Sequence, residues 1–129
     1  MCIRDRSMRI APSVISWRRQ TNVATSIGGV DVPAGADLLL VIGSANHDAD
    51  HFDDADTFRL DRAIPRDHLA LGHGIHLCMG APLARLELQT LLSRFLERFP
   101  SARLADVAPP SYSPNTSFRG PNQLWVDLA

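Results

Sequence analysis

Apolar residues between Leu83 and Phe99 recur at steps of three and four, which is the spacing of one face of an α-helix. Pro82 suits the first turn of such a helix, and Pro100 ends it because proline cannot continue the helical hydrogen bonding. The pattern therefore predicts a helix of roughly 25 Å between these prolines. Its expected apolar face comprises Ala84, Leu88, Leu91, Leu92, Phe95 and Phe99.

Two short β segments are expected before this helix, on either side of the adjacent glycines Gly28 and Gly29. Residues 33–35, Pro-Ala-Gly, then turn the chain into the apolar run at residues 38–42. A small sheet is predicted for this region.

The end of the chain shows a second β pattern. Residues 120–122 form a turn signal, and the side chains of Leu124, Val126 and Leu128 alternate onto one face of the segment that follows. This pattern predicts a terminal β hairpin.

Composition narrows the function. The chain has 129 residues, 45% of them hydrophobic, a net charge of −1 and a pI near 6.5, so it lacks the basic field that nucleic acids or anionic membranes attract. Its longest apolar run, residues 38–42, is far too short to span a bilayer, and residues 1–20 contain no signal-peptide hydrophobic region. With only Cys2 and Cys78 there is no disulfide framework, so we expect a reduced thiol and a cytoplasmic protein. A small-molecule function fits best.

The stretch "LGHGIHLCMG", residues 71–80, surrounds Cys78 with glycines directly before the predicted helix. The unpaired N–H groups at a helix N-terminus stabilise an anion, so a thiolate is favoured there. Gly72, Gly74 and Gly80 permit positive φ angles and let a large planar group approach the backbone. The loop is built to present its sulfur.

Three interpretations of Cys78 follow: a buried structural residue, a catalytic nucleophile or a metal ligand. A structural cysteine needs no flanking glycines, and a nucleophile would need a histidine base beside it. The ligand interpretation explains the most features. Zinc remains an alternative, because His68, His73, His76 and Cys78 supply four donors, although their spacing matches no common finger pattern.

The longer stretch "LGHGIHLCMGAPLARLE", residues 71–87, closely resembles the cysteine-ligand loop and following helix of the cytochrome P450 family. The resemblance implies that Cys78 is the thiolate ligand of the iron of haem b, and that Gly72 and Gly80 belong to the haem-binding loop. It also implies that His76 hydrogen-bonds a haem propionate. Leu71 stands where the family usually has phenylalanine, and we expect it to retune the site while still excluding water from the sulfur.

Upstream segments resemble the same family in the same order. "MRIAPSV" resembles the end of its E-x-x-R helix, with Arg9 as the arginine, and "FRLDR" supplies Arg62, which resembles the loop arginine of the family's charge triad. The partner glutamate should stand at position 6, but this chain has Arg6 there. We therefore predict that residues 1–7 are a non-native or misread leader and that residues 8–129 are the C-terminal part of a single haem-thiolate monooxygenase domain; the alternative is that the triad itself has diverged in this chain.

Further roles follow from the resemblance. Arg19 matches a second propionate-binding position, with Arg18 as its competitor, and an exposed β residue is the plainer interpretation. Val14 and Ile15 become candidate substrate contacts. Arg85 matches an arginine that faces the electron donor in relatives, or is simply a solvated helix charge.

The segment "SANHDADHF" resembles a structural part of the family. In it, Asn46 and Asp48 are expected to bridge turns through side-chain to backbone hydrogen bonds. They are expected to have no catalytic role.

The implied fold is the mainly α cytochrome P450 fold with small β sheets, of which this chain would be the haem-ligand portion, α+β in content. The implied activity is that of a bacterial monooxygenase, which inserts one atom of dioxygen into a small hydrophobic organic substrate. Electrons would come from NAD(P)H through ferredoxin reductase and ferredoxin. We expect the fragment alone to be inactive. The alternatives are a non-catalytic haem- or zinc-binding module and an interaction domain with a buried cysteine.

Overall fold

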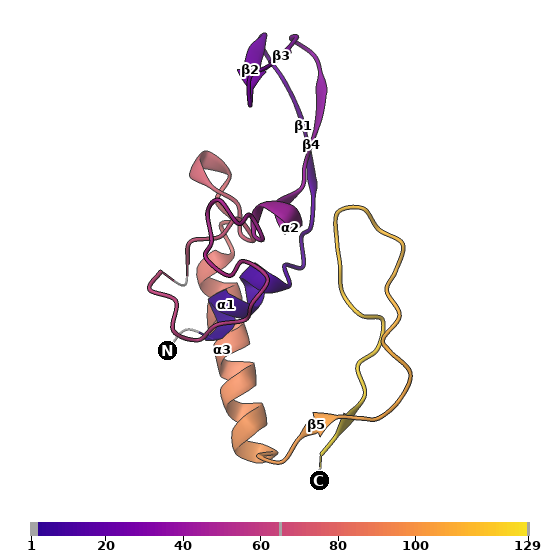
Figure 1. Ribbon diagram of the computed structural model, residues 1–129. Coiled ribbons are helices and arrows are strands. Elements are labelled where there is room, and N and C mark those ends of the chain that lie inside the picture. Colours follow the sequence, from indigo (N-terminus) through magenta and orange to yellow (C-terminus); the bar gives the residue numbers. More distant parts are fainter. Residues whose placement is uncertain (1–2, 65, 129) are drawn as a thin grey trace.

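The predicted long helix is α3, Ala81–Arg98, which runs from the middle to the bottom of the molecule in Figure 1. Pro82 lies in its first turn, and the N–H of Phe99 donates a 2.8 Å hydrogen bond to the Phe95 carbonyl at its end. Its least exposed positions include Ala84, Leu88, Leu92, Phe95 and Phe99, so the predicted apolar face is confirmed apart from the exposed Leu91. The computed structural model describes residues 3–64 and 66–128. Cys2, in the expected leader, lies outside the described residues.

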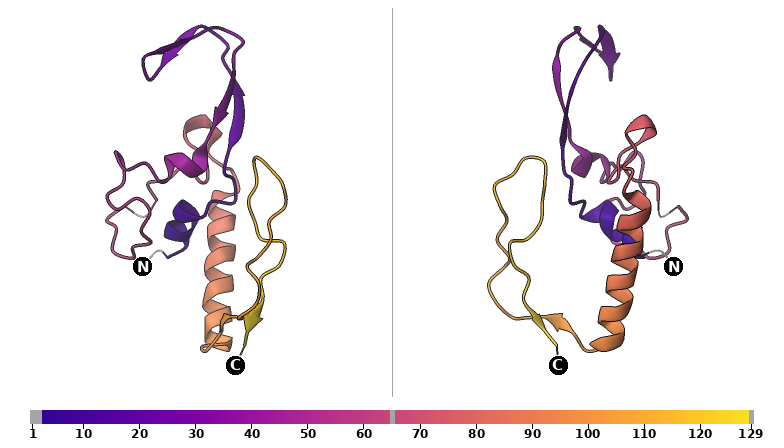
Figure 2. Two further views of the ribbon diagram at one scale, coloured as in Figure 1. Left: turned by 45° about the vertical axis from the view of Figure 1, so that its right-hand side comes forward. Right: turned by 180° about the vertical axis from the view of Figure 1, so that it is seen from behind.

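The predicted small sheet is a pair of antiparallel ribbons. Strand β1 (Trp17–Gln20) pairs with β4 (Asp37–Leu40), and β2 (Thr25–Ile27) pairs with β3 (Val30–Val32). Gly28 and Gly29 connect β2 to β3 with φ angles of +57° and +81°, which only glycine adopts without strain. Figure 2 shows this ribbon extending away from α3. The apolar run that follows is divided between β4 and the short helix α2 (Ile42–Ala45).

The predicted terminal hairpin differs from the structure in extent and pairing. Only β6 (Val126–Asp127) is a strand there, and it pairs with the distant β5 (Arg103–Leu104). Residues 105–125 form a long loop between these strands, with isolated bridges Val14↔Phe118 and Tyr112↔Pro121. Prolines interrupt the ladder because they cannot donate a backbone hydrogen bond. They stand at positions 109, 110, 114 and 121.

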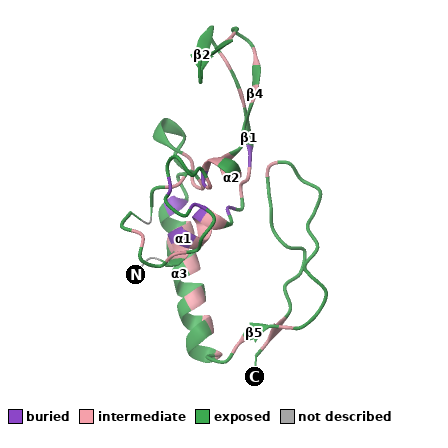
Figure 3. Cartoon of the chain, in the orientation of Figure 1, coloured by how far each residue is buried: buried purple, intermediate pink, exposed green. Residues whose placement is uncertain are grey.

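Helix α1 (Ile3–Ile10) packs against α3. The short 3₁₀ helix η1 (Gly74–His76) lies in residues 69–80, which carry Cys78 and are here called the cysteine loop. The residues buried most deeply are few and mainly polar (Figure 3). They are Phe52, Ala55 and Ala81 on the apolar side, and Asp5, Arg6, Arg9, Ser16 and Asn46 on the polar side. Among the described helices, none is long and apolar enough to cross a membrane.

The chain exposes more surface than its mass predicts. Its accessible area is 9773 Å², whereas a folded monomer of 14.2 kDa exposes about 6,800 Å². Large apolar side chains on α3 contribute, among them Leu83, Leu86 and Leu96. The fold therefore presents apolar faces with no partner among the described residues.

Candidate cofactor site around Cys78

The loop that carries Cys78 is closed by its own backbone. The N–H of Cys78 donates a 2.8 Å hydrogen bond to the carbonyl of Leu71, across the turn made by η1. At Gly72 the φ angle is +78°, and a Cβ there would lie 2.5 Å from the carbonyl oxygen of His76. Only glycine fits at position 72, so the motif has glycine there for a steric reason.

Cys78 is an exposed free thiol at the start of α3. Its carbonyl accepts a 3.0 Å hydrogen bond from the N–H of Ala81, and Gly80 occupies the cap position without a capping side chain. A Cβ at Gly80 would lie 3.7 Å from the sulfur, so glycine leaves that side of the sulfur open. The sulfur thus lies just before the first turn of α3.

The sulfur opens into a cavity of about 570 Å³, a volume typical of cofactor sites. Segments far apart in sequence line it: the chain from residue 14 into β1, the end of β4 with the start of α2, and residues 69–78. Six residues expected at the site line this one cavity: Val14, Arg19, Leu71, Gly72, His76 and Cys78. The structure therefore brings together most of the predicted cofactor residues.

Arg19 and Arg18 lie on opposite faces of β1, because side chains alternate along a strand. Arg19 is half-buried and lines the cavity, whereas Arg18 is exposed and does not line it. The guanidinium of Arg19 also donates a 2.9 Å hydrogen bond to the carbonyl of Arg18. This placement favours Arg19 over Arg18 as the residue that faces a bound group.

The two candidate substrate contacts are separated by the structure. Val14 lines the cavity, but Ile15 is not among the lining residues. The N–H of Ile15 donates to the Ser117 carbonyl at 2.8 Å, and its carbonyl accepts from the N–H of Gly43 at 2.9 Å. Ile15 thus ties the C-terminal loop to α2 and is not brought to the cavity.

The four proposed zinc donors are not gathered at one point. His68 has a buried side chain whose Nδ1 accepts from the N–H of Ala70 at 3.2 Å, and burial lowers the pKa of this imidazole. Within residues 3–64 and 66–128, no group of three His, Cys, Asp or Glu side chains is arranged to hold a metal ion. A single exposed sulfur with an arginine and a histidine across the cavity suits a planar group that carries carboxylates and one axial ligand better than tetrahedral zinc.

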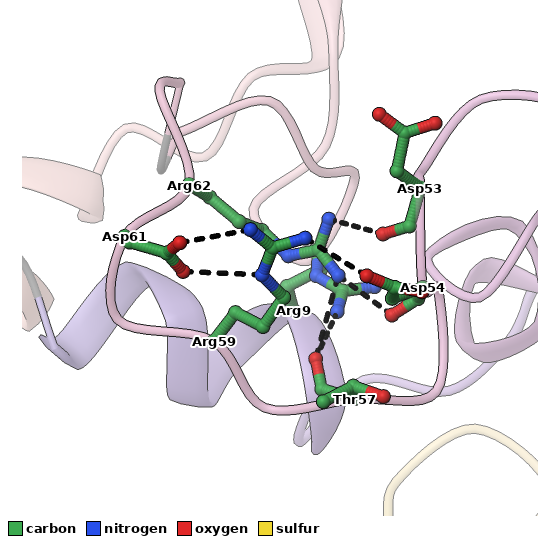
Figure 4. Close-up of polar contacts among 7 residues, drawn as sticks. All are labelled: Arg9, Asp53, Asp54, Thr57, Arg59, Asp61 and Arg62. Carbon is green, nitrogen blue, oxygen red and sulfur yellow. Dashed lines mark hydrogen bonds and ion pairs between the residues drawn. The ribbon is translucent and has the colours of Figure 1, made fainter.

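Arg9 is buried beneath residues 46–62, here called the aspartate-rich loop (Figure 4). Its guanidinium donates to the carbonyls of Asn46 at 2.6 Å, Ala55 at 2.8 Å and Thr57 at 3.3 Å. Burial, and then the nearby charge of Arg62, lower the pKa of Arg9. Arg9 thus holds the loop through carbonyl oxygens.

Arg62 lies beside Arg9, as the charge-triad prediction requires, and donates to the carbonyls of Asp53 at 2.6 Å and Asp54 at 2.7 Å (Figure 4). Arg6 donates to the Arg62 carbonyl at 2.8 Å. The Nε and Nη1 of Arg6 and the Nε of Arg62 are buried without a hydrogen-bond partner. Position 6 therefore adds a third guanidinium where the family pattern expects a carboxylate.

Two carboxylates close in sequence to Arg62 form their hydrogen bonds with Arg59. Arg59 pairs with the side chains of Asp54 and Asp61, both at 2.8 Å. Its hydrogen bond lowers the pKa of Asp61 to about 2. These exposed pairs lie at the rim of the loop, where they pin its backbone.

Arg85 is drawn onto α1. Its Nε donates to the carboxylate of the fully buried Asp5 at 2.7 Å, and its side chain is 18% exposed. The structure thus places Arg85 in an intramolecular ion pair, neither as a solvated charge nor as an open docking residue.

Asp48 bridges a turn as expected, whereas Asn46 joins two segments that are distant in sequence. Asn46 is fully buried, and its side-chain oxygen accepts a 2.8 Å hydrogen bond from the N–H of Leu69. Asp48 accepts from the N–H of Asp50 at 2.9 Å. Asn46 therefore connects the aspartate-rich loop to the start of the cysteine loop.

The cavity also has lining residues that the sequence did not single out, namely Trp17, Leu40, Ile42, Leu69 and Ala70. Trp17 was not predicted from the sequence, because the pairing of β1 with β4 decides which face of β1 meets the cysteine loop. In this pairing Trp17 lies opposite Leu40 and Arg19 lies opposite Leu38. Period-two alternation from Arg19 would have placed Trp17 on the same face.

Comparison with known proteins gives consistent matches. Residues 5–123 match the sequence profile described as "Cytochrome P450". The chain is 38% identical over 122 residues to a steroid C26-monooxygenase of Mycolicibacterium smegmatis. The aligned region covers 95% of this chain and 30% of that protein. The chain is 43% identical to a beta-dihydromenaquinone-9 omega-hydroxylase of Mycobacterium bovis, over 95% of itself and 24% of that protein. The chain thus spans less than a third of the length of these relatives.

Solved structures agree in fold. The haem domain of a P450 from Tepidiphilus thermophilus superposes with a TM-score of 0.90 at 40% identity, over 95% of this chain and 29% of that one. An intact type IV self-sufficient cytochrome P450 monooxygenase superposes with a TM-score of 0.92 at 46% identity, over 96% of this chain and 16% of that one.

The match to the sequence profile begins at residue 5, which lies inside the segment expected to be a non-native or misread leader.

Proposed function

Because the chain belongs to the cytochrome P450 family, we propose that it is the haem-binding C-terminal part of a monooxygenase that acts on a small hydrophobic organic substrate. The observation that carries this proposal is the convergence of Cys78, His76 and Arg19 on one cavity. Haem b, bound through a thiolate, would supply the activation of dioxygen and the transfer of one oxygen atom to the substrate.

The chain's own residues would bind and orient the cofactor. Cys78, an exposed sulfur at the positive end of α3, would hold the haem iron. Arg19 and His76 face the same space and would hold the two carboxylates, since a guanidinium forms strong charge-assisted hydrogen bonds to a carboxylate. Leu71, whose carbonyl is bonded to the Cys78 amide, would keep water from the sulfur.

The electron source and location belong to the same proposal. We expect NAD(P)H to supply electrons through ferredoxin reductase and ferredoxin, in the bacterial cytoplasm. Arg85 supports no docking role in this structure, because it is paired with Asp5. If residues 1–7 are a foreign leader, that pair would be absent from the parent enzyme and Arg85 would be open to a donor.

Turnover by this chain alone is not expected. It spans 30% of the length of the first relative and exposes 9773 Å² of surface, so the cavity would leave a bound haem partly open to water. A non-catalytic haem-binding module is the second candidate, and this open cavity is the observation that favours it. Hydroxylase activity of a full-length version of the protein would decide for the monooxygenase.

The first test is spectroscopic. The chain is reconstituted with hemin, reduced with dithionite and exposed to carbon monoxide, in parallel with Cys78→Ser. We expect a strongly red-shifted Soret band that Cys78→Ser abolishes, because only a thiolate ligand gives that shift. The matched control Cys2→Ser should keep the band. An identical spectrum for wild type and Cys78→Ser would refute thiolate ligation.

A further inference from the structure

We propose that Trp17 is a haem-contacting residue of this cavity and that Phe118 positions its indole ring. The inference rests on the proposed function, since it concerns the same cofactor site. Among the described residues that line the cavity, Trp17 is the one tryptophan, tyrosine or phenylalanine.

The strand places the indole on the cofactor side. Trp17 and Arg19 are two residues apart on β1, so their side chains share the face that meets the cysteine loop. The register fixes this face, because Trp17 pairs with Leu40, which also lines the cavity. A group held by Arg19 and Cys78 would therefore lie within reach of the indole.

A second element holds the ring in place. The rings of Trp17 and Phe118 meet edge to face, with centroids 6.0 Å apart and planes at 84°. Phe118 is fixed in turn by its bridge to Val14, and the N–H of Arg119 donates to the Ser13 carbonyl at 2.8 Å. The hydroxyl of Ser16 donates to the carbonyl of Thr116 beside them. Phe118 does not line the cavity, so its part is positioning.

Part of Trp17 is open to the cavity. Despite its partner Phe118, the residue is 42% exposed at the wall of the cavity. Burying an aromatic ring of this size against a flat apolar group is strongly favourable, and indole stacks well on planar π systems. A haem macrocycle has this shape and chemistry, so its binding would cover the exposed part of Trp17.

The test measures the rate at which hemin leaves the reconstituted chain for an excess of a haem-scavenging apoprotein. Trp17→Ala should release hemin about tenfold faster than wild type, and Trp17→Phe should recover most of the difference because it keeps an aromatic face. Phe118→Ala should accelerate release about threefold, in line with the loss of one aromatic pair, and Phe118→Tyr should restore the wild-type rate.

The matched control is Trp125→Ala, the same change at a tryptophan that lines a different cavity, with Leu104 and Pro110. Its release rate should equal that of wild type. Equal acceleration by Trp17→Ala and Trp125→Ala would show a general loss of folding and overturn the inference. An unchanged rate in Trp17→Ala, with a thiolate spectrum that still depends on Cys78, would overturn the role of Trp17 alone. No hemin binding at all would overturn both proposals.

Discussion

Exchange of Arg6 for glutamate should stabilise this chain, which is unusual for a single substitution at a buried position. Arg6 is 7% exposed, and two of its three guanidinium nitrogens have no hydrogen-bond partner. It lies against Arg62, whose charge already lowers the pKa of Arg9. Asp61 is a carboxylate whose pKa the charge of Arg6 helps to lower, but it makes no hydrogen bond to the two buried nitrogens. Buried polar groups of a charged side chain that lack hydrogen bonds are costly.

The expected gain follows from these contacts. Each buried donor without a partner costs about 1–3 kcal/mol, and two of them disappear with Arg6. The bond from Arg6 to the Arg62 carbonyl is lost, at about 1 kcal/mol. A carboxylate at position 6 would also pair with Arg62, whose Nε has no partner now. Together these terms predict a free energy of unfolding that is higher by about 3 kcal/mol in Arg6→Glu.

Urea unfolding followed by tryptophan fluorescence measures this difference. The control is Arg66→Glu, which makes the same change in net charge at an exposed residue and should shift stability by less than about 0.5 kcal/mol. Arg6→Gln should give only part of the gain, because it removes the charge without adding a carboxylate. Equal or lower stability of Arg6→Glu relative to Arg66→Glu would refute the reasoning.

Three further predictions concern the loop, the cavity and pH. Gly72→Ala should destabilise the chain by about 2 kcal/mol more than Gly74→Ala in urea unfolding, because both have positive φ angles but only Gly72 has a carbonyl 2.5 Å from the added Cβ. Arg19→Ala should weaken hemin binding about tenfold in a titration of the Soret band, whereas Arg18→Ala should leave it unchanged. Burial lowers the pKa of His68 from its usual 6.5, so the unfolded chain takes up that proton first. Stability should thus fall as the pH drops below 6.5, and His68→Gln should flatten this dependence in thermal unfolding.

The elements that the sequence predicted are those specified by local rules. The spacing of Leu88, Leu92 and Phe95 follows the helical period, and the glycine pair at the tip of β2 and β3 requires positive φ angles. The terminal hairpin was not predicted correctly, because its alternation describes a face but does not identify the partner strand. That partner, β5, comes from the other side of a proline-rich loop, and tertiary contacts alone choose it.

The cofactor residues could be predicted for a different reason. Cys78, His76 and Gly72 lie within one short motif whose backbone closes on itself through the bond from Cys78 to Leu71. Arg19 was predicted by resemblance, and only the register of β1 against β4 separates it from Arg18. The two-residue spacing from Arg19 was the one local signal for Trp17, since a tryptophan in a strand is otherwise equally common in an ordinary core.

Continuous hydrogen bonding links Arg9 to the cysteine loop. Arg9 donates to the carbonyl of Asn46, whose side chain accepts from the N–H of Leu69. The Leu69 carbonyl accepts from the N–H of Gly72 at 2.9 Å, next to the Leu71 carbonyl that holds the Cys78 amide. With so few buried apolar side chains, these bonds supply much of what fixes the loop.

Replacement of Arg6 by glutamate should therefore also change how firmly the cysteine loop holds hemin at Cys78. Arg6→Glu should slow the release of hemin from the reconstituted chain, because a more firmly held Arg9 keeps Asn46 and the cysteine loop in their bonded positions. Asn46→Ala in the same background should remove this benefit, since it breaks the bond to Leu69. Slower release in Arg6→Glu that persists in the double variant would show that the effect reaches Cys78 by another route, most directly through the contact of α1 with α3.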